Sequence, residues 1–163
     1  MYIEKGGEFN MRKLLFIIIG LIGLTFVGCV DVLEEAPETK IPNLKIISDN
    51  QEISVEKGGY EWTTKAGLFR EQHIVADTAS PDQIAKEMTG DKVTTQSQLN
   101  LEFTEKPDKV TVIPWGEVKD VEYTSTEDTI IVPEKEGIYI FEVIGEWSQG
   151  KVSYTTKLIV ENN

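Results

Sequence analysis

The stretch GIYIFEVIGEW, residues 137–147, decides the fold class of this chain. Its odd-numbered positions carry mostly large apolar side chains, whereas isoleucines and glutamates share the even-numbered positions. Because successive side chains of a β-strand point to opposite faces, this period of two predicts a half-buried strand. The first face holds Tyr139, Phe141, Val143 and Trp147, and the second holds Ile138, Ile140, Glu142, Ile144 and Glu146.

The same alternation appears on both sides of this stretch. QLNLEF, residues 98–103, places Leu99, Leu101 and Phe103 on one face. KVSYTTKLIV, residues 151–160, alternates in the same way, and the intervening SQGK (148–151) predicts a tight hairpin. In this last strand the predicted inner residues are Val152, Tyr154, Thr156, Leu158 and Val160, and the predicted outer ones are Ser153, Thr155 and Lys157.

Turn residues divide the rest of the chain into short strands. KGGY (57–60) is interpreted as a turn that opens a strand ending at Trp62. The predicted strands are 44–48, 52–56, 59–64, 70–75, 92–95, 98–104, 109–114, 119–123, 128–132, 137–147 and 151–161.

One segment, SPDQIAKEM (80–88), favours a helix. Ser80 suits the N-cap, Pro81 suits the first helical position, and Asp82 suits the positive end of the helix. Many short strands with one short helix predict an all-β protein, a two-sheet antiparallel sandwich that spans residues 44–163.

The segment EGIYIF resembles the strand of immunoglobulin-like domains that carries Gly-x-Tyr-x-Cys, in which the tyrosine forms a corner. Gly137 and Tyr139 match that motif, and Phe141 stands in the place of the cysteine. The domain also resembles immunoglobulin-like modules in uncharacterised lipoproteins of Bacillus-type bacteria. That resemblance rests on GGYEW (58–62), VADTASP (75–81), LNLEF (99–103), PW (114–115), GIYIFEVIGEW (137–147) and GKVSY (150–154), and it implies no agreed function.

Read from Met11, the chain begins as an exported protein does. Arg12 and Lys13 precede an apolar run, residues 14–27, that is shorter than the roughly 20 residues of a membrane span. Gly28 followed by Cys29 resembles the lipobox of bacterial lipoproteins, although Phe26 stands where that family most often has leucine. The resemblance implies cleavage before Cys29 and attachment of lipid to its thiol. An uncleaved signal anchor is the alternative.

Two further segments flank the predicted signal peptide of residues 11–28. Residues 1–10 include Glu4 and Glu8, which do not suit the start of a signal peptide, and codons for EKGGE can spell a ribosome-binding sequence. We therefore interpret these ten residues as an untranslated leader that has been misread as coding sequence. Residues 29–43 contain two prolines and no periodicity, which indicates a lipidated tether. Docking of Leu33 or Ile41 as an edge strand is the alternative.

Composition excludes some classes of function. The formal net charge of −12 disfavours binding to nucleic acid, whose phosphates such a surface repels. One cysteine cannot form an internal disulfide, and one histidine cannot build a histidine-rich metal site.

Catalytic and metal-binding patterns are weak. His73 with Asp77 could serve a hydrolase, but no Gly-x-Ser-x-Gly motif accompanies them, and a surface histidine is the simpler interpretation. Calcium needs six to eight oxygen ligands, and the scattered acidic residues lack EF-hand spacing. The loose candidates are Asp77, Asp82, Asp120, Glu122 and residues 127–129.

The three tryptophans divide into two groups. Trp62 and Trp147 lie in strand patterns that predict core packing. Trp115 lies between Pro114 and Gly116 and is the better candidate for an exposed ring that binds a ligand, such as a sugar.

These observations favour a non-catalytic lipoprotein at the outer face of the cell membrane. We expect membrane attachment through Cys29, a protein or cell-wall partner, and no cofactor. Trp115, His73 and Asp77 are the candidate surface-binding residues. A calcium- or glycan-binding module is the first alternative, and a hydrolase is the second.

Overall fold

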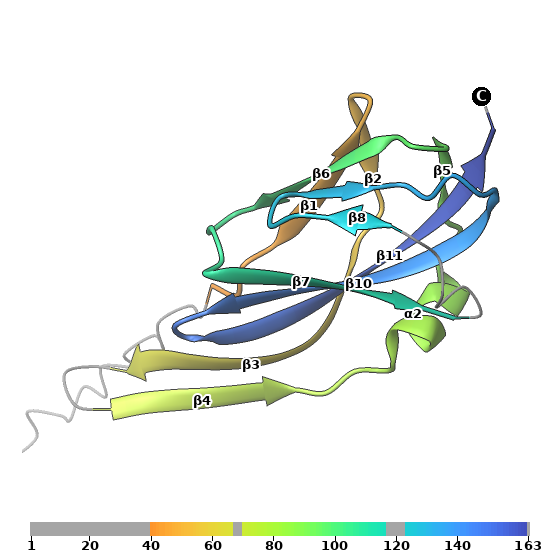
Figure 1. Ribbon diagram of the computed structural model, residues 1–163. Coiled ribbons are helices and arrows are strands. Elements are labelled where there is room, and N and C mark those ends of the chain that lie inside the picture. The colour runs from red at the N-terminus through yellow and green to blue at the C-terminus, as the bar shows by residue number, and fades with distance from the viewer. Residues whose placement is uncertain (1–39, 67–69, 117–122, 163) are drawn as a thin grey trace, which may run out of the picture. The chain divides into compact units, whose positions relative to one another are not determined.

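The computed structural model describes residues 40–66, 70–116 and 123–162 (Figure 1). The predicted leader, signal peptide, Gly28, Cys29 and most of the tether lie outside the described residues. The strand predicted at 119–123 also lies outside them, apart from Tyr123, which is not in a strand.

Eleven strands and one helix make up the described part of the chain. They are β1 (Leu44–Ser48), β2 (Gln51–Ile53), β3 (Glu56–Ala66), β4 (Arg70–Ala76), α2 (Pro81–Glu87), β5 (Asp91–Thr94), β6 (Gln98–Phe103), β7 (Lys109–Trp115), β8 (Thr124–Ser125), β9 (Thr129–Ile131), β10 (Gly137–Trp147) and β11 (Gly150–Glu161). Sheet A has the order β2-β1-β6-β9-β8, and sheet B has the order β4-β3-β11-β10-β7, with β5 paired to β11.

The strand order within these sheets is that of an immunoglobulin-like sandwich. β1-β6-β9-β8 corresponds to the A-B-E-D sheet of that fold, and β7-β10-β11 corresponds to C-F-G. Between the first and second strands of this order, the chain inserts β2, the β3–β4 hairpin, α2 and β5. All pairs are antiparallel except that of β5 with β11. The predicted fold class is confirmed.

The corner expected at Tyr139 is present. The Tyr139 hydroxyl donates a hydrogen bond of 2.6 Å to the carbonyl of Lys135, four residues earlier in the loop before β10. This is the tyrosine corner of immunoglobulin-like domains, in which a phenol at the start of one strand holds the preceding loop.

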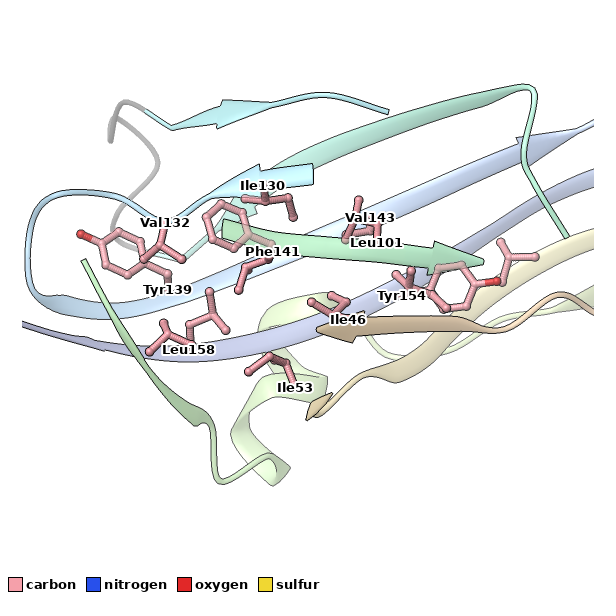
Figure 2. Close-up of a cluster of buried hydrophobic side chains, with 14 of the residues drawn as sticks. Ile46, Ile53, Leu101, Ile130, Val132, Tyr139, Phe141, Val143, Tyr154 and Leu158 are labelled. Atoms are coloured by element: carbon pink, nitrogen blue, oxygen red, sulfur yellow. The ribbon is translucent and has the colours of Figure 1, made fainter. Parts of the chain in front are cut away.

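The core lies between the two sheets, and Figure 2 shows side chains from both. The alternation predicted for β10 is confirmed, because Tyr139, Phe141, Val143 and Trp147 are buried. They pack with residues of sheet A such as Ile46, Leu99, Leu101 and Ile130, and with Val152, Tyr154, Leu158 and Val160 of β11. Trp62 and Trp147 are core residues, as predicted, with ring centroids 5.5 Å apart.

The predicted hairpin after β10 is also confirmed. Trp147 and Gly150 are partners at the end of the β10–β11 ladder, so residues 148–149 form the loop. A Cβ atom on Gly150 would collide with the backbone carbonyl of Glu61 in β3. Only glycine therefore allows β3 and β11 to approach each other here.

The predicted turn at KGGY is wrong. Gly58 and Gly59 lie inside β3, where the register with β11 shifts between Val152 and Tyr154. A glycine pair inside a strand accommodates such a bulge, which sequence alone cannot distinguish from a turn. The predicted strand 52–56 is also interrupted, because Ser54 leaves the ladder and its amide donates to the Asp91 carboxylate at 2.7 Å.

The helix α2 occupies the outer face of sheet B, the face turned away from sheet A. Ser80 is at the N-cap position, but its hydroxyl donates to the Asp82 carboxylate at 2.5 Å, and this bond lowers the pKa of Asp82. At the other end, the Lys157 ammonium donates to the carbonyls of Ala85 and Met88 at 2.9 and 2.8 Å. Thr155, predicted to face solvent, is buried because α2 packs against β11.

Residues 41–42 of the predicted tether are held against the sandwich. Ile41 packs on the core, and the carbonyl of Pro42 accepts a hydrogen bond of 2.8 Å from the Tyr154 hydroxyl. The described part of the chain contains no helix with the length and apolar character that a membrane span requires.

Candidate functional site

The three candidate binding residues lie on the outer face of sheet B, but they do not meet. His73 and Asp77 share one face at the β4 edge, while Trp115 lies in β7 at the opposite edge. Four strand spacings of about 4.8 Å separate these edges, which places Trp115 on the order of 19 Å from β4. A ligand that contacts both Trp115 and His73 must therefore be an extended molecule.

His73 does not pair with Asp77. Its Nδ1 lies 3.1 Å from the Thr63 hydroxyl of the neighbouring strand, and the side chain is exposed. Among the described residues, no three histidine, cysteine or carboxylate side chains lie close enough to hold a metal ion. Asp120 and Glu122, two of the loose calcium candidates, are outside these residues.

Trp115 is half-buried and fixed by a hydrogen bond, whereas an exposed ring was expected. Its Nε1 donates to one carboxylate oxygen of Glu142 at 2.8 Å. The other oxygen of Glu142 accepts a bond of 2.6 Å from the Ser153 hydroxyl. Sequence reasoning missed this cluster. Glu142 occupies an outward position of the alternating strand, but no pattern identifies its two donors, which come from β7 and β11.

A hollow of about 290 Å³ adjoins Glu142 on the outer face of sheet B. Gly59 of β3 is part of its lining and adds no side chain there. Glu61 and Lys151 form an ion pair of 3.5 Å at its edge. Its walls include Tyr60, Val75, Asp77 and Ile144, so Asp77 is the only sequence-predicted candidate that lines it.

A larger cavity of about 630 Å³ lies at one end of the sandwich. The β6–β7 loop and the β8–β9 turn meet there, and these correspond to the B–C and D–E loops of an immunoglobulin-like domain. The floor is apolar, while the rim carries three carboxylates and one lysine. The floor residues are Leu101, Phe103, Pro107 and Val110, and the charged rim residues are Glu102, Lys106, Glu127 and Asp128.

The frame around this cavity is held by aromatic packing and by hydrogen bonds. The Phe103 ring packs edge-on against Trp147 and Tyr154, with centroids 5.8 and 6.0 Å apart. The Trp147 Nε1 donates to the Glu105 carbonyl at 3.1 Å, and the Asp108 amide donates to the Glu146 carbonyl at 2.8 Å. The β6–β7 loop is thus joined to the β10–β11 hairpin, which corresponds to the F–G loop.

The turn on the other side of the cavity is tied down as well. The Thr126 hydroxyl donates to the Asp128 carboxylate at 2.8 Å, and the Leu101 amide donates to the Asp128 carbonyl at 2.8 Å. Sequence reasoning did not find this cavity, because its residues come from two separate segments, 101–110 and 126–128, and neither carries a recognisable motif.

Comparisons of the chain with protein-family models, with curated proteins and with solved structures gave no match. The function must therefore be inferred from the two hollows and from the sequence that precedes the domain.

Proposed function

We propose that this protein is a non-catalytic lipoprotein of the cell surface, whose immunoglobulin-like domain binds a protein or cell-wall component. The Gly28–Cys29 sequence after an apolar run supports attachment to the membrane through Cys29. The cavity at the loop end of the sandwich is the observation that carries the binding function.

The size and lining of this cavity suit a binding site. Its volume of about 630 Å³ falls within the range of ligand pockets, which are mostly apolar with a few polar groups. Loops on a rigid scaffold commonly carry recognition, and in antibody variable domains the B–C and F–G loops contact antigen. Phe103 is fixed by two aromatic neighbours and provides an apolar surface. A partner that covers this surface does not have to order the phenylalanine side chain first.

The charge of the rim restricts the partner. Glu102, Glu127 and Asp128 outnumber Lys106, and the whole chain is acidic. Opposite charge steers partners together and like charge keeps them apart. The binding group is therefore an apolar segment that carries positive or no charge, and not a phosphate polymer.

Binding can be tested with isolated cell envelopes. Purified protein is sedimented with membranes and with membrane-free walls, and the bound fraction is compared with that of Glu127→Lys. The matched control is Glu87→Lys, an equal charge reversal at an exposed position on α2. We expect Glu127→Lys to bind less than the parent and Glu87→Lys to bind equally. Equal binding by all three proteins, or by none, would contradict recognition at the loop end.

Membrane attachment needs its own test. Radiolabelled palmitate should label the parent chain in producing cells and should not label Cys29→Ser. Equal labelling of both would contradict lipidation at Cys29, while leaving the binding experiment unaffected.

A glycan-binding function has one observation in its favour. Trp115 is held by Glu142 beside a hollow that Asp77 also lines, and a fixed aromatic ring with carboxylates can bind sugars. Wall sugars should then raise the melting temperature of the parent but not of Glu142→Gln. Calcium, tested in the same assay, distinguishes an ion-binding module. If neither wall sugars nor calcium shift the melting temperature, a protein partner is favoured.

A further inference from the structure

The free strand edges of this sandwich differ sharply in their capacity to accept another strand. An edge strand presents unpaired backbone groups to which a further strand can add, and natural proteins usually block such edges. Three described edges are short, since β2 has three residues, β8 has two and β5 has four. The two longer edges, β4 and β7, lie at opposite sides of sheet B.

The β7 edge is blocked although it has seven residues. The carbonyl of Val112 accepts a hydrogen bond of 2.8 Å from the Tyr123 hydroxyl, so the backbone groups of Val112 point away from β10. Because backbone direction alternates along a strand, those of Pro114 point the same way. Proline has no amide hydrogen, so this edge lacks one donor and has one acceptor already occupied.

The β4 edge is open by comparison. It has seven residues without proline, and among the described strands it pairs only with β3. Its side chains are mostly exposed. Val75 is 52% exposed and is one of two large apolar side chains with high exposure in the described part of the chain.

The charge of β4 also differs from that of the chain. The only fully charged residues of β4 are Arg70 and Glu71, and their charges cancel, so the strand has no net charge. The whole chain has a formal net charge of −12. Repulsion between two acidic copies is therefore small where two β4 edges approach each other. An edge kept free of net negative charge suits a second copy of this chain better than it suits a basic peptide.

We infer that β4 pairs antiparallel with β4 of a second copy, so that two sheets B become one continuous sheet. The two copies are related by a two-fold axis perpendicular to the sheet. All seven residues find partners when His73 lies on the axis. Glu71 then faces Val75 of the other copy and Arg70 faces Ala76, so no carboxylates oppose each other and Val75 is covered.

Disulfide trapping on the purified full-length protein tests this arrangement. Cys29, the one cysteine of the chain, is first replaced by serine, and the Cys29→Ser chain serves as the blank. Single cysteines are placed at Glu71, His73 and Val75, and at Gln83 on α2 as a matched exposed control. After mild oxidation, the covalent dimer is measured on a non-reducing gel.

Antiparallel pairing predicts a specific pattern. Residue 73 faces residue 73 of the second copy at the axis. The Cα atom of residue 71 lies about 14 Å from that of residue 71 in the second copy, whereas the two Cα atoms of a disulfide lie within about 7 Å of each other. We expect His73→Cys to give at least about five-fold more dimer than Gln83→Cys, Glu71→Cys or Val75→Cys alone. A mixture of Glu71→Cys and Val75→Cys chains should form the mixed dimer efficiently, because these positions face each other.

The pattern also shows when the inference is wrong. A maximum at Gln72→Cys or Ile74→Cys still supports self-pairing of β4, with the axis moved by one residue. No dimer at any position of β4, or equal dimer at β4 and at Gln83→Cys, would overturn it, because random collision gives no dependence on position.

Discussion

Replacement of Tyr139 by phenylalanine isolates the hydrogen bond that defines the corner before β10. The ring is 2% exposed and stays in place, so no cavity forms, and only the 2.6 Å bond to the Lys135 carbonyl is lost. Such a bond contributes about 1 kcal/mol net, and leaving a buried partner unpaired costs about 1–3 kcal/mol. The bond is only partly buried and Lys135 is an exposed residue, so the lower figure applies. We expect a loss of about 1 kcal/mol, or roughly 4 °C in melting temperature.

Urea unfolding followed by tryptophan fluorescence measures this loss, with Tyr60→Phe as the control. Tyr60 is half-buried, and its hydroxyl forms no hydrogen bond among the described residues, so its replacement should change stability by less than about 0.5 kcal/mol. A Tyr139→Phe variant as stable as the parent would refute the assignment of the corner. A loss above about 3 kcal/mol would instead mean that the carbonyl is shut off from water.

The pH dependence of the same pair gives an independent check. Burial raises the pKa of Tyr139 above the value of 10.0 for a free tyrosine. The stability that comes from keeping this phenol neutral is complete below pH 10 and is lost as pH rises through the raised pKa. The difference in stability between the parent and Tyr139→Phe should therefore shrink above pH 10, since phenylalanine cannot ionise. An unchanged difference up to pH 11 would contradict this reasoning.

Three further predictions concern other parts of the sandwich. Gly150→Ala should destabilise by more than about 2 kcal/mol in thermal unfolding, because its Cβ meets the Glu61 carbonyl, and unchanged stability would contradict that contact. Tyr154→Phe should cost about 2 kcal/mol, more than Tyr139→Phe, because the Pro42 carbonyl that it leaves unpaired is buried, and equal losses would show that water reaches both. Lys157→Met should cost about 1–2 kcal/mol and speed amide hydrogen exchange in α2, where two carbonyls lose their donor, and unaltered exchange would argue against this role.

The alternating stretches were sufficient to predict the sandwich. In β10 the period of two identifies the buried residues, since each inward position meets the opposite sheet, and Gly137 with Tyr139 marks the corner. The hairpin of residues 148–149 follows from the two stretches that flank it. Such features are local, so a single segment contains the information that determines them.

Features that depend on distant segments could not be predicted. Thr155 alternates as a surface residue, and only the position of α2 buries it. Gly58 and Gly59 resemble a turn until β11 is placed beside them. The cavity at the loop end joins two segments that are distant in sequence, and the Glu142 cluster joins three strands, so no local pattern identifies either site.

The placement of β11 has a consequence for how quickly the molecule forms. One edge of this strand pairs antiparallel with β3 along residues 150–155 and parallel with β5 along residues 158–161. Its Tyr154 hydroxyl reaches a carbonyl 112 residues away, and its Thr156 hydroxyl reaches one 102 residues away. Contacts so remote in sequence require large loops to close first, and chains dominated by them fold in milliseconds to seconds. Until β11 is in place, β3 and β5 lack the strand that pairs with both of them. We therefore expect refolding to be slow and its rate to be sensitive to substitutions in β11.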